Sequence, residues 1–386
     1  MALVAAGTCL IAGTYGLVRL AYGLFLPDIQ TSVSMGSAAA GYVSTGASAA
    51  YCVGALVGLA AAHRPRLLVA GALSTAAVGS VGMALAAGMA AFVPAAVVAS
   101  TGAGLASPGL VAIVQRNLPA GRVDPAQATV NAGTGPGLVA AGLLALVLTQ
   151  WRVGFVVAAT FTAAAGIAVL LLDRRGGSAG DPAPTRDDRR WLASLAVPAT
   201  AAVLLGAASA AVWTYGRAHL VAAGASGSAS TVAWIAIGVG GTATVLTARA
   251  LSGQPAPRAW LLTTSAVALA IAALGLAPER YAFATLACAI FGWGFVAASS
   301  ALIAWTTALV PDRAAAGTSL LFVALVLGQA VGSSAAGALS GRIGLSSTYL
   351  LAAVVSLSAG LCSVRSRPCG GRPRCGRPRP SAGRST

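Results

Sequence analysis

The sequence contains no lysine and few acidic residues. Its 386 residues include 24 basic residues, all of them arginine, and eight acids, so charged residues make up 8% of the chain. Soluble proteins carry about 25% charged residues, and this deficit excludes an ordinary soluble globule. The net charge of +16 does not indicate nucleic-acid binding, because the arginines stand in short runs between apolar stretches.

Motifs of catalysis and metal binding are lacking as well. We find no HExxH motif and no GxSxG motif with a plausible base, and the six cysteines have no zinc-binding spacing. We therefore expect no enzyme activity, no cofactor and no metal site. No basic residue precedes the N-terminal apolar stretch, which predicts a permanent membrane span and not a cleaved signal peptide.

What the chain does contain is hydrophobic sequence in long runs, 57% of all residues, together with 48 glycines. Small residues allow helices to pack closely in lipid, and about 20 apolar residues cross a bilayer. The sequence predicts an all-α membrane protein with twelve transmembrane helices at residues 4–26, 41–61, 67–87, 91–114, 127–149, 152–172, 194–217, 229–249, 259–277, 282–310, 315–339 and 345–363.

The arginines support this count. With the N-terminus inside, 19 of the 24 arginines fall in inner loops and the C-terminal tail, and four fall in outer loops, as the positive-inside rule expects. We predict a multi-pass protein of the inner or plasma membrane with both termini cytoplasmic. Membrane lipids are its expected surroundings, nucleic acid is not an expected partner, and we expect a monomer.

The longest polar insertion divides the chain into two halves. It spans residues 173–190 and has the composition of a linker. Tyr22-Gly23 and Tyr215-Gly216 stand at corresponding places in the two halves. We predict two pseudo-symmetric six-helix bundles, 1–172 and 191–363, joined by a cytoplasmic linker, 173–190. A disordered basic cytoplasmic tail is expected at 364–386.

Arg19 stands inside the first span, where a charge costs roughly 2.5–3.5 kcal/mol by insertion scales. Such residues face a protein interior or a water-filled cavity, and Tyr15 and Tyr22 are expected to share its helical face. A structural arginine is the alternative. We find no acid deep within a span; Asp28, at the outer end of the first one, is the nearest candidate proton site, against a solvated helix-end residue.

A positive cavity favours an anionic or polar neutral substrate. The aromatic side chains of Trp213, Tyr215 and Trp293 are candidate walls, and each of them is alternatively a lipid-facing or interfacial residue. Gln329 is a polar side chain at depth that either binds substrate or joins helices. The candidate substrate-binding residues are thus Arg19, Tyr15, Tyr22, Trp213, Tyr215, Trp293 and Gln329.

Several motifs resemble the major facilitator superfamily. In span five, Gly133-Thr134-Gly135-Pro136-Gly137 resembles the family's Gly-Pro motif of exporters, and Pro136 with these glycines suits a helix bend; a packing kink is the alternative. Trp151-Arg152 resembles the usual start of span six. The loop after span two keeps Arg64 and Arg66 but lacks the family's aspartate, so the cytoplasmic brace implied by the resemblance rests on these two arginines.

The resemblance implies the major facilitator fold and a secondary active transporter that moves a small polar, anionic or aromatic solute by alternating access. Export is favoured over uptake, on the span-five motif alone. A small-molecule substrate is the expected partner, and a proton is the coupling ion to consider. The alternative is a membrane sensor or scaffold that keeps the transporter fold without moving solute.

Overall fold

The structure, a computed structural model, describes residues 1–148, 150–174 and 190–365. Its elements in the first part of the chain are α1 Ala2–Ile11, η1 Ala12–Leu20, α2 Ala21–Ser32, α3 Ser37–Ala60, α4 Pro65–Leu85, α5 Met89–Asn117, α6 Ala120–Asn131, α7 Thr134–Val147 and α8 Trp151–Leu172. Those of the second part are α9 Arg190–Ser194, α10 Ala196–Ala222, α11 Gly227–Ser252, α12 Ala256–Leu276, α13 Tyr281–Leu309, η2 Pro311–Arg313 and α14 Ala314–Arg365.

Eleven helical segments of the described chain are long and apolar enough to cross a membrane, and the last of them has 49 residues. At 1.5 Å per residue, that segment would be more than twice as long as the ~30 Å hydrocarbon core. It is interrupted at Gly344, whose φ of 80° and ψ of 163° are not helical. Divided there, α14 supplies two spans, and the predicted all-α fold with twelve transmembrane helices is confirmed.

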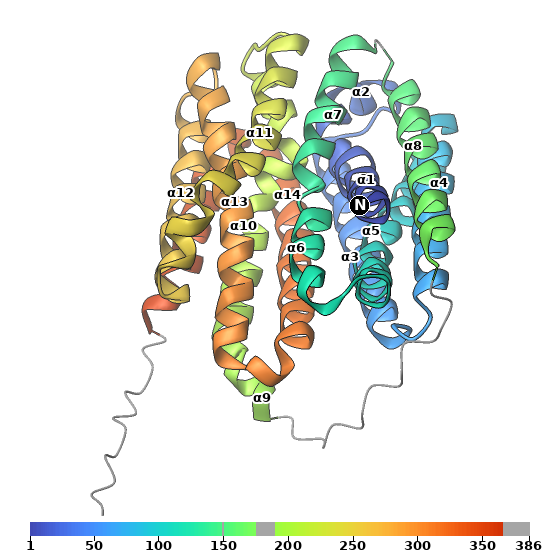
Figure 1. The fold of residues 1–386 in the computed structure, drawn as a ribbon. Coiled ribbons are helices and arrows are strands. Elements are labelled where there is room, and N and C mark those ends of the chain that lie inside the picture. Colours follow the sequence, from blue (N-terminus) through green and yellow to red (C-terminus); the bar gives the residue numbers. More distant parts are fainter. Residues whose placement is uncertain (149, 175–189, 366–386) are drawn as a thin grey trace, which may run out of the picture.

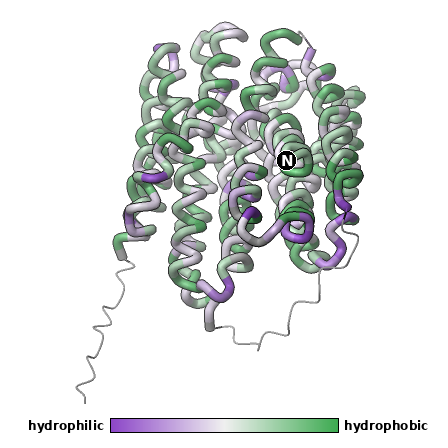
Figure 2. Tube along the Cα trace, viewed as in Figure 1, coloured by the Kyte–Doolittle hydropathy of each residue, from purple (hydrophilic) through white to green (hydrophobic). Residues whose placement is uncertain are grey.

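The outer surface of the helices is apolar. Figure 2 shows hydrophobic residues over the sides of the molecule and many of the hydrophilic ones towards its two ends. Leucines and valines that point outwards are largely exposed, such as Leu246 at 86%, Val147 at 79% and Leu171 at 78%. Such a surface needs lipid around it, because water would leave this apolar area unburied.

Helices pack mainly on neighbours from their own part of the chain. In the first part α4 packs on α5 and α8, and α3 on α5; in the second part α10 and α12 pack on α14, and α11 on α13. Figure 1 shows these two groups side by side. The groups meet along a seam where α3 contacts α14, α7 contacts α11 and α2 contacts α10.

The molecule has two ends along its helices. The linker end is the one with α9, at the bottom of Figure 1, and with Asp173 directly after α8; the opposite end is where α2 and α10 end. The greater parts of the predicted linker and tail, residues 175–189 and 366–386, lie outside the described residues.

The first span changes its helix type in the middle. Residues Ala12–Leu20 form a π-helix between α1 and α2. Long π-helical stretches are rare and frequently occur at functional sites. Two glycines let this segment approach its neighbours: a Cβ on Gly16 would lie 2.6 Å from the Cα of Gly137, and one on Gly13 would lie 3.1 Å from the Cβ of Thr162. The π-helix ends with Arg19 and Leu20 at the seam.

Candidate functional site

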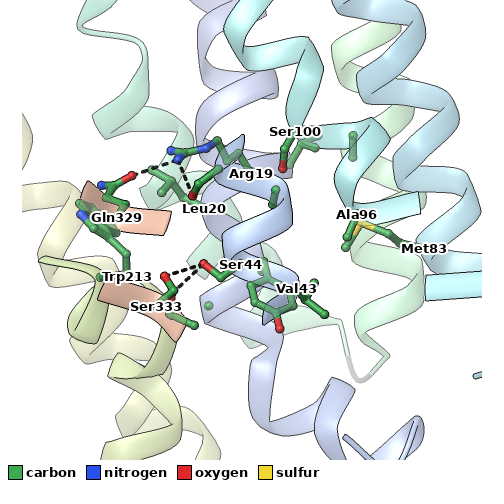
Figure 3. Close-up of a pocket in the computed structure, with 18 residues that line it drawn as sticks. Arg19, Leu20, Val43, Ser44, Met83, Ala96, Ser100, Trp213, Gln329 and Ser333 are labelled. Carbon is green, nitrogen blue, oxygen red and sulfur yellow. Dashed lines mark hydrogen bonds between the residues drawn. The ribbon is translucent and has the colours of Figure 1, made fainter. Parts of the chain in front are cut away.

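A cavity of about 40 Å³ lies between the two groups of helices. One water molecule needs roughly 10–15 Å³ measured in this way, so the cavity has room for about three waters. Figure 3 shows it with Arg19 and Gln329 on facing elements. Its walls come from η1, α2, α3, α4 and α5 of the first group and from α10 and α14 of the second.

Arg19 carries the charge of this cavity. Its Nη2 donates to Oε1 of Gln329 at 3.0 Å and to Oγ of Ser48 at 3.4 Å. Its Cζ lies 4.8 Å from the ring centroid of Tyr51, a cation–π contact. The Nε of Arg19 is buried and has no hydrogen-bond partner among the described residues. Because Gln329 belongs to α14, this guanidinium joins the two groups of helices across the seam.

A triangle of hydroxyl groups lies in the wall of the cavity, on its side towards the opposite end. Ser44 on α3 lies 3.0 Å from Thr214 on α10 and 3.0 Å from Ser333 on α14, and Thr214 lies 3.1 Å from Ser333. Hydroxyl groups both donate and accept, so the three satisfy one another. The dashed lines below Arg19 in Figure 3 include part of this triangle.

Three other predicted binding residues line the same cavity. The ring of Tyr22 lies in the wall, while its hydroxyl donates to the carbonyl of Ala40 at 3.0 Å. Trp213 packs edge-on against Phe291 with 5.3 Å between ring centroids, and its Nε1 is buried without a partner in the described part of the chain. Gln329 holds Arg19. The sequence therefore identified four cavity residues: Arg19, Tyr22, Trp213 and Gln329.

Tyr15 lies next to the cavity but not in its wall. Its hydroxyl is 3.0 Å from the hydroxyl of Tyr51 and 3.0 Å from that of Ser107. Tyr51 in turn carries the Arg19 guanidinium on its ring. Tyr15 thus supports Arg19 through Tyr51, and any contact with substrate would require a rearrangement.

The structure places two further predicted wall residues away from the cavity. Tyr215 is 1% exposed, and its hydroxyl lies within hydrogen-bond distance of the carbonyls of Ser37, at 2.9 Å, and Ser333, at 3.2 Å. Trp293 donates from Nε1 to Thr247 at 2.9 Å, between α13 and α11. Tyr215 therefore joins helices at the seam, and Trp293 joins helices within the second group. Neither residue lines the cavity.

The span-five motif lies at a break between two helices. α6 ends at Asn131 and α7 begins at Thr134, so Pro136 stands in the first turn of α7, where a missing N–H is tolerated. The glycines bring neighbours close: a Cβ on Gly137 would lie 2.6 Å from the carbonyl oxygen of Ala12, and one on Gly135 would lie 2.6 Å from Oγ1 of Thr242. Gly133 likewise approaches the backbone of Thr8. The motif thus coincides with an interruption between α6 and α7, and its role as a helix bend or in gating stays a prediction.

Of the two predicted brace residues, Arg66 is part of a charge cluster at the linker end. Its Nη1 lies 3.2 Å from a carboxylate oxygen of Asp173. Arg116 also pairs with this carboxylate, and Asn117 donates to it at 2.7 Å. Arg64 is exposed at the start of α4. An acid from the end of span six thus meets Arg66, although the loop itself has no aspartate.

The environment of Asp173 favours its charged form. Burial of the carboxyl raises its pKa, but the hydrogen bonds from Arg116 and Asn117 and the positive charges of Arg116 and Arg66 outweigh burial, and the pKa lies below its ordinary value. The cluster ties α4, α5 and the end of α8 together. Sequence analysis missed it, although an acid directly after a span and beside a run of arginines was a visible signal.

At the opposite end, another ion pair joins the two groups of helices across the seam. Arg217 on α10 donates from Nη1 to Asp28 of α2 at 2.5 Å and to the carbonyl of Leu24 at 2.8 Å. Its Nε donates to Ser230 at 3.2 Å. The sequence reading placed Arg217 in an outer loop; it is instead 8% exposed, within a helix. Asp28, with 47% of its side chain exposed, is held by this arginine.

Sequence reasoning also missed the hydroxyl triangle. Serine and threonine recur throughout these alanine-rich spans, where they commonly bond to the carbonyl four residues earlier, as Thr14 does with Leu10. Ser44, Thr214 and Ser333 differ only in facing one another across the seam. No spacing in the sequence reveals that.

In the described part of the chain, twelve membrane helices form two packed groups with a cavity between them that holds a few polar side chains, an arrangement typical of polytopic membrane transporters. The sequence pattern of the Major Facilitator Superfamily matches residues 8–317, and the chain belongs to this family.

Solved structures of transporters share the fold. A structure of the nucleoside transporter NupG has a TM-score of 0.75 at 14% identity, covering 95% of this chain and 99% of that one. A D-xylose-proton symporter has a TM-score of 0.75 at 16% identity, covering 94% of this chain and 96% of the other. A peptide transporter POT bound to alafosfalin has a TM-score of 0.76 at 14% identity, covering 94% and 93%. At such identities the likeness shows the fold alone, and no curated protein matches this chain in sequence.

Proposed function

We propose that this protein is a secondary active transporter that moves a small polar, anionic or aromatic solute by alternating access, with export favoured over uptake. The observation that carries the proposal is the cavity itself. It lies between the two groups of helices, and each group contributes polar side chains to it, such as Arg19 from one and Gln329 from the other. A site built at such a seam is exposed first to one side and then to the other when the groups rock.

The moving units in this proposal are the bundles 1–172 and 191–363, with 173–190 as linker and 364–386 as tail. The linker end faces the cytoplasm, which places both termini inside and most arginines on the inner surface. The membrane is the inner or plasma membrane. Charge distribution in the sequence supports this orientation.

The structure corresponds in this proposal to a state closed at the outer side. The ion pair of Arg217 with Asp28, the bond of Tyr215 with Ser37 and the hydroxyl triangle all join the groups at or near the opposite end. The transition to an outward-open state must break these contacts. Because several are polar and partly buried, the closed state has a distinct energy minimum.

The favoured direction rests on the span-five motif and its resemblance to that of exporters. In the structure Gly135 approaches Thr242 of α11 across the seam, so the motif belongs to a contact that must change during rocking. A proton is the coupling ion we consider, with Asp28 as the acid nearest to the path.

A reversible cross-link at the seam tests transport by alternating access. Ser44 and Ser333 have hydroxyl oxygens 3.0 Å apart, so cysteines at both positions bring two sulfur atoms within bonding reach. The double variant is made in a background without the six native cysteines and reconstituted in vesicles with a solute found by thermal-shift screening.

We expect oxidation to stop solute flux and reduction to restore it, with both single variants unaffected by oxidant. Flux that continues through the oxidised double variant contradicts alternating access at this seam. Ligand binding without any flux in the reduced protein supports the sensor or scaffold instead.

A further inference from the structure

Two residues that line the central cavity have buried N–H donors without partners. The described part of the chain has five buried side-chain N or O atoms without a hydrogen bond, and two of them, Nε of Arg19 and Nε1 of Trp213, belong to residues that line this cavity. Trp213 is 8% exposed. A buried donor without an acceptor is destabilising, and it commonly marks the place of a ligand group that accepts.

The cavity has no negatively charged side chain that could pair with the positive charge of Arg19. None of the residues that line it is acidic, and Arg19 is held by the neutral groups of Gln329 and Ser48. An arginine presents several N–H groups in a plane that fits two oxygen atoms of a carboxylate. A cation would meet an uncompensated positive charge in a site shielded from water.

Most of the remaining wall is apolar. Val18, Leu20, Val43, Met83 and several alanines surround the polar groups, and Phe291 and Phe295 pack against the ring of Trp213. An inorganic anion would leave this apolar surface unused. An organic anion would bury its carbon atoms there and gain from doing so.

We infer that the central cavity is a binding site for a small organic monocarboxylate, with Arg19 as its anchor and the indole N–H of Trp213 as a second donor. This inference rests on the proposed function, because it names the substrate class of the same site. The two unsatisfied N–H groups, one of them on the positively charged Arg19 side chain, would donate to one carboxylate group, and the apolar wall would contact its carbon tail.

Gln329 then occupies part of the carboxylate's place in the empty protein. Its Oε1 accepts from Arg19 at 3.0 Å, as an oxygen of a bound carboxylate would. Arrival of the ligand displaces this amide from the guanidinium. The contact between η1 and α14 across the seam is thereby replaced by a contact with the ligand. Ligand binding would thus break one of the contacts that hold the two groups of helices together.

This exchange makes the charge at position 329 a sharp test. Gln329→Glu places a permanent carboxylate against Arg19, so it should weaken binding of an external carboxylate at least tenfold. Gln329→Leu removes the competing oxygen and should bind at least as tightly as the unmodified protein. A purely structural role of the Arg19–Gln329 bond predicts the reverse order, because the glutamate strengthens that bond and leucine abolishes it.

Acetate and propionate, small enough for a cavity of this size, serve as the probes, with acetamide and propionamide as neutral analogues of the same shape and nitrate as an inorganic planar anion. Binding to the purified full chain is measured by calorimetry and by thermal shift. We expect both carboxylates to bind, both amides to bind at least tenfold more weakly, and Arg19→Lys to lose at least tenfold in affinity since it cannot present a planar fork.

A matched pair of tryptophan variants tests the second donor. Trp213→Phe removes the free indole N–H at the cavity and should weaken carboxylate binding about tenfold, the range of a hydrogen bond to a charged group. Trp293→Phe removes an indole N–H that is bonded to Thr247 away from the cavity and should leave affinity unchanged. Equal effects of the two substitutions contradict the assignment of Trp213.

The inference is overturned if amides bind as well as acids, or if nitrate binds and the organic acids do not. It is also overturned if Gln329→Glu binds carboxylates like the unmodified protein. Its failure is distinguishable from failure of the proposed function: vesicles that accumulate a neutral solute refute the carboxylate site and keep the transporter, whereas carboxylate binding without flux refutes the transporter and keeps the site.

Discussion

The closure at the opposite end should open when one methyl group is added at Gly337. This glycine of α14 lies at the seam. A Cβ there would stand 2.5 Å from the hydroxyl of Tyr215 on α10, 2.8 Å from the carbonyl oxygen of Ser37 and 3.2 Å from the Cα of Ala38, the last two in the backbone of α3. Ordinary contact begins at 3.4 Å, so Gly337→Ala requires the two helices to separate by about 0.6 Å. Backbone atoms cannot move aside as a flexible side chain would.

Overpacking of this kind costs typically 1–3 kcal/mol. Because α3 and α14 are in different halves, the cost of the contacts with Ser37 and Ala38 falls on the closed state and disappears when the seam opens. The contact with Tyr215 lies within the second half, and the flexible end of that side chain moves aside in either state. Each 1.4 kcal/mol changes an equilibrium tenfold. We therefore expect Gly337→Ala to raise the population open at this end by about 5- to 140-fold, with a small effect on unfolding.

Gly102→Ala provides the matched control. A Cβ there would lie 2.6 Å from the carbonyl oxygen of Ala72, a similar clash between α5 and α4, but within one half. It should lower thermal stability and leave the opening equilibrium unchanged.

The assay is the rate at which a membrane-impermeant maleimide labels Ser44→Cys in the cavity, together with the melting temperature. Faster labelling for Gly337→Ala and lower melting for Gly102→Ala are the expected results. The reasoning is refuted if Gly337→Ala lowers the melting temperature as much as Gly102→Ala and labelling stays at the original rate.

Three further predictions concern the charge clusters. Asp28→Asn removes the partner of Arg217; since the carboxylate is about half exposed, the loss is screened to about 0.5–1 kcal/mol, and labelling of the cavity should rise a few-fold, less so at high salt. Asp173→Asn should lower the free energy of unfolding by about 3 kcal/mol at neutral pH. Because the folded pKa of Asp173 is lowered, its stabilisation is present above the unfolded pKa of about 3.9 and is lost as pH falls through the folded pKa; melting curves of the variant should lack this acid-dependent loss. Arg66→Ala should destabilise the protein and Arg64→Ala should not, as measured by thermal melting, and equal melting temperatures would contradict the role of Arg66.

The pattern of hydrophobic runs and arginines was sufficient to predict twelve membrane helices. Length and polarity decide whether a segment crosses lipid, and both are properties of the sequence itself. Even the division of α14 at Gly344 was predicted, because polar residues and glycines separate the last two runs. Arg19 and Gln329 were recognised as binding candidates because polar side chains are costly in lipid and therefore face the interior of the protein.

Which polar groups meet was decided by the tertiary structure. Asp173 pairs with Arg66 over a separation of 107 residues, and Asp28 with Arg217 over 189. Tyr215 and Trp293 have the same chemistry as Tyr22 and Trp213, yet only the latter two line the cavity. The sequence of an α-helical span shows which residues share a face. Which neighbour that face points towards depends on how the helix is rotated about its axis, and this is set by close packing of small residues against other helices. The sequence of one span does not contain that information.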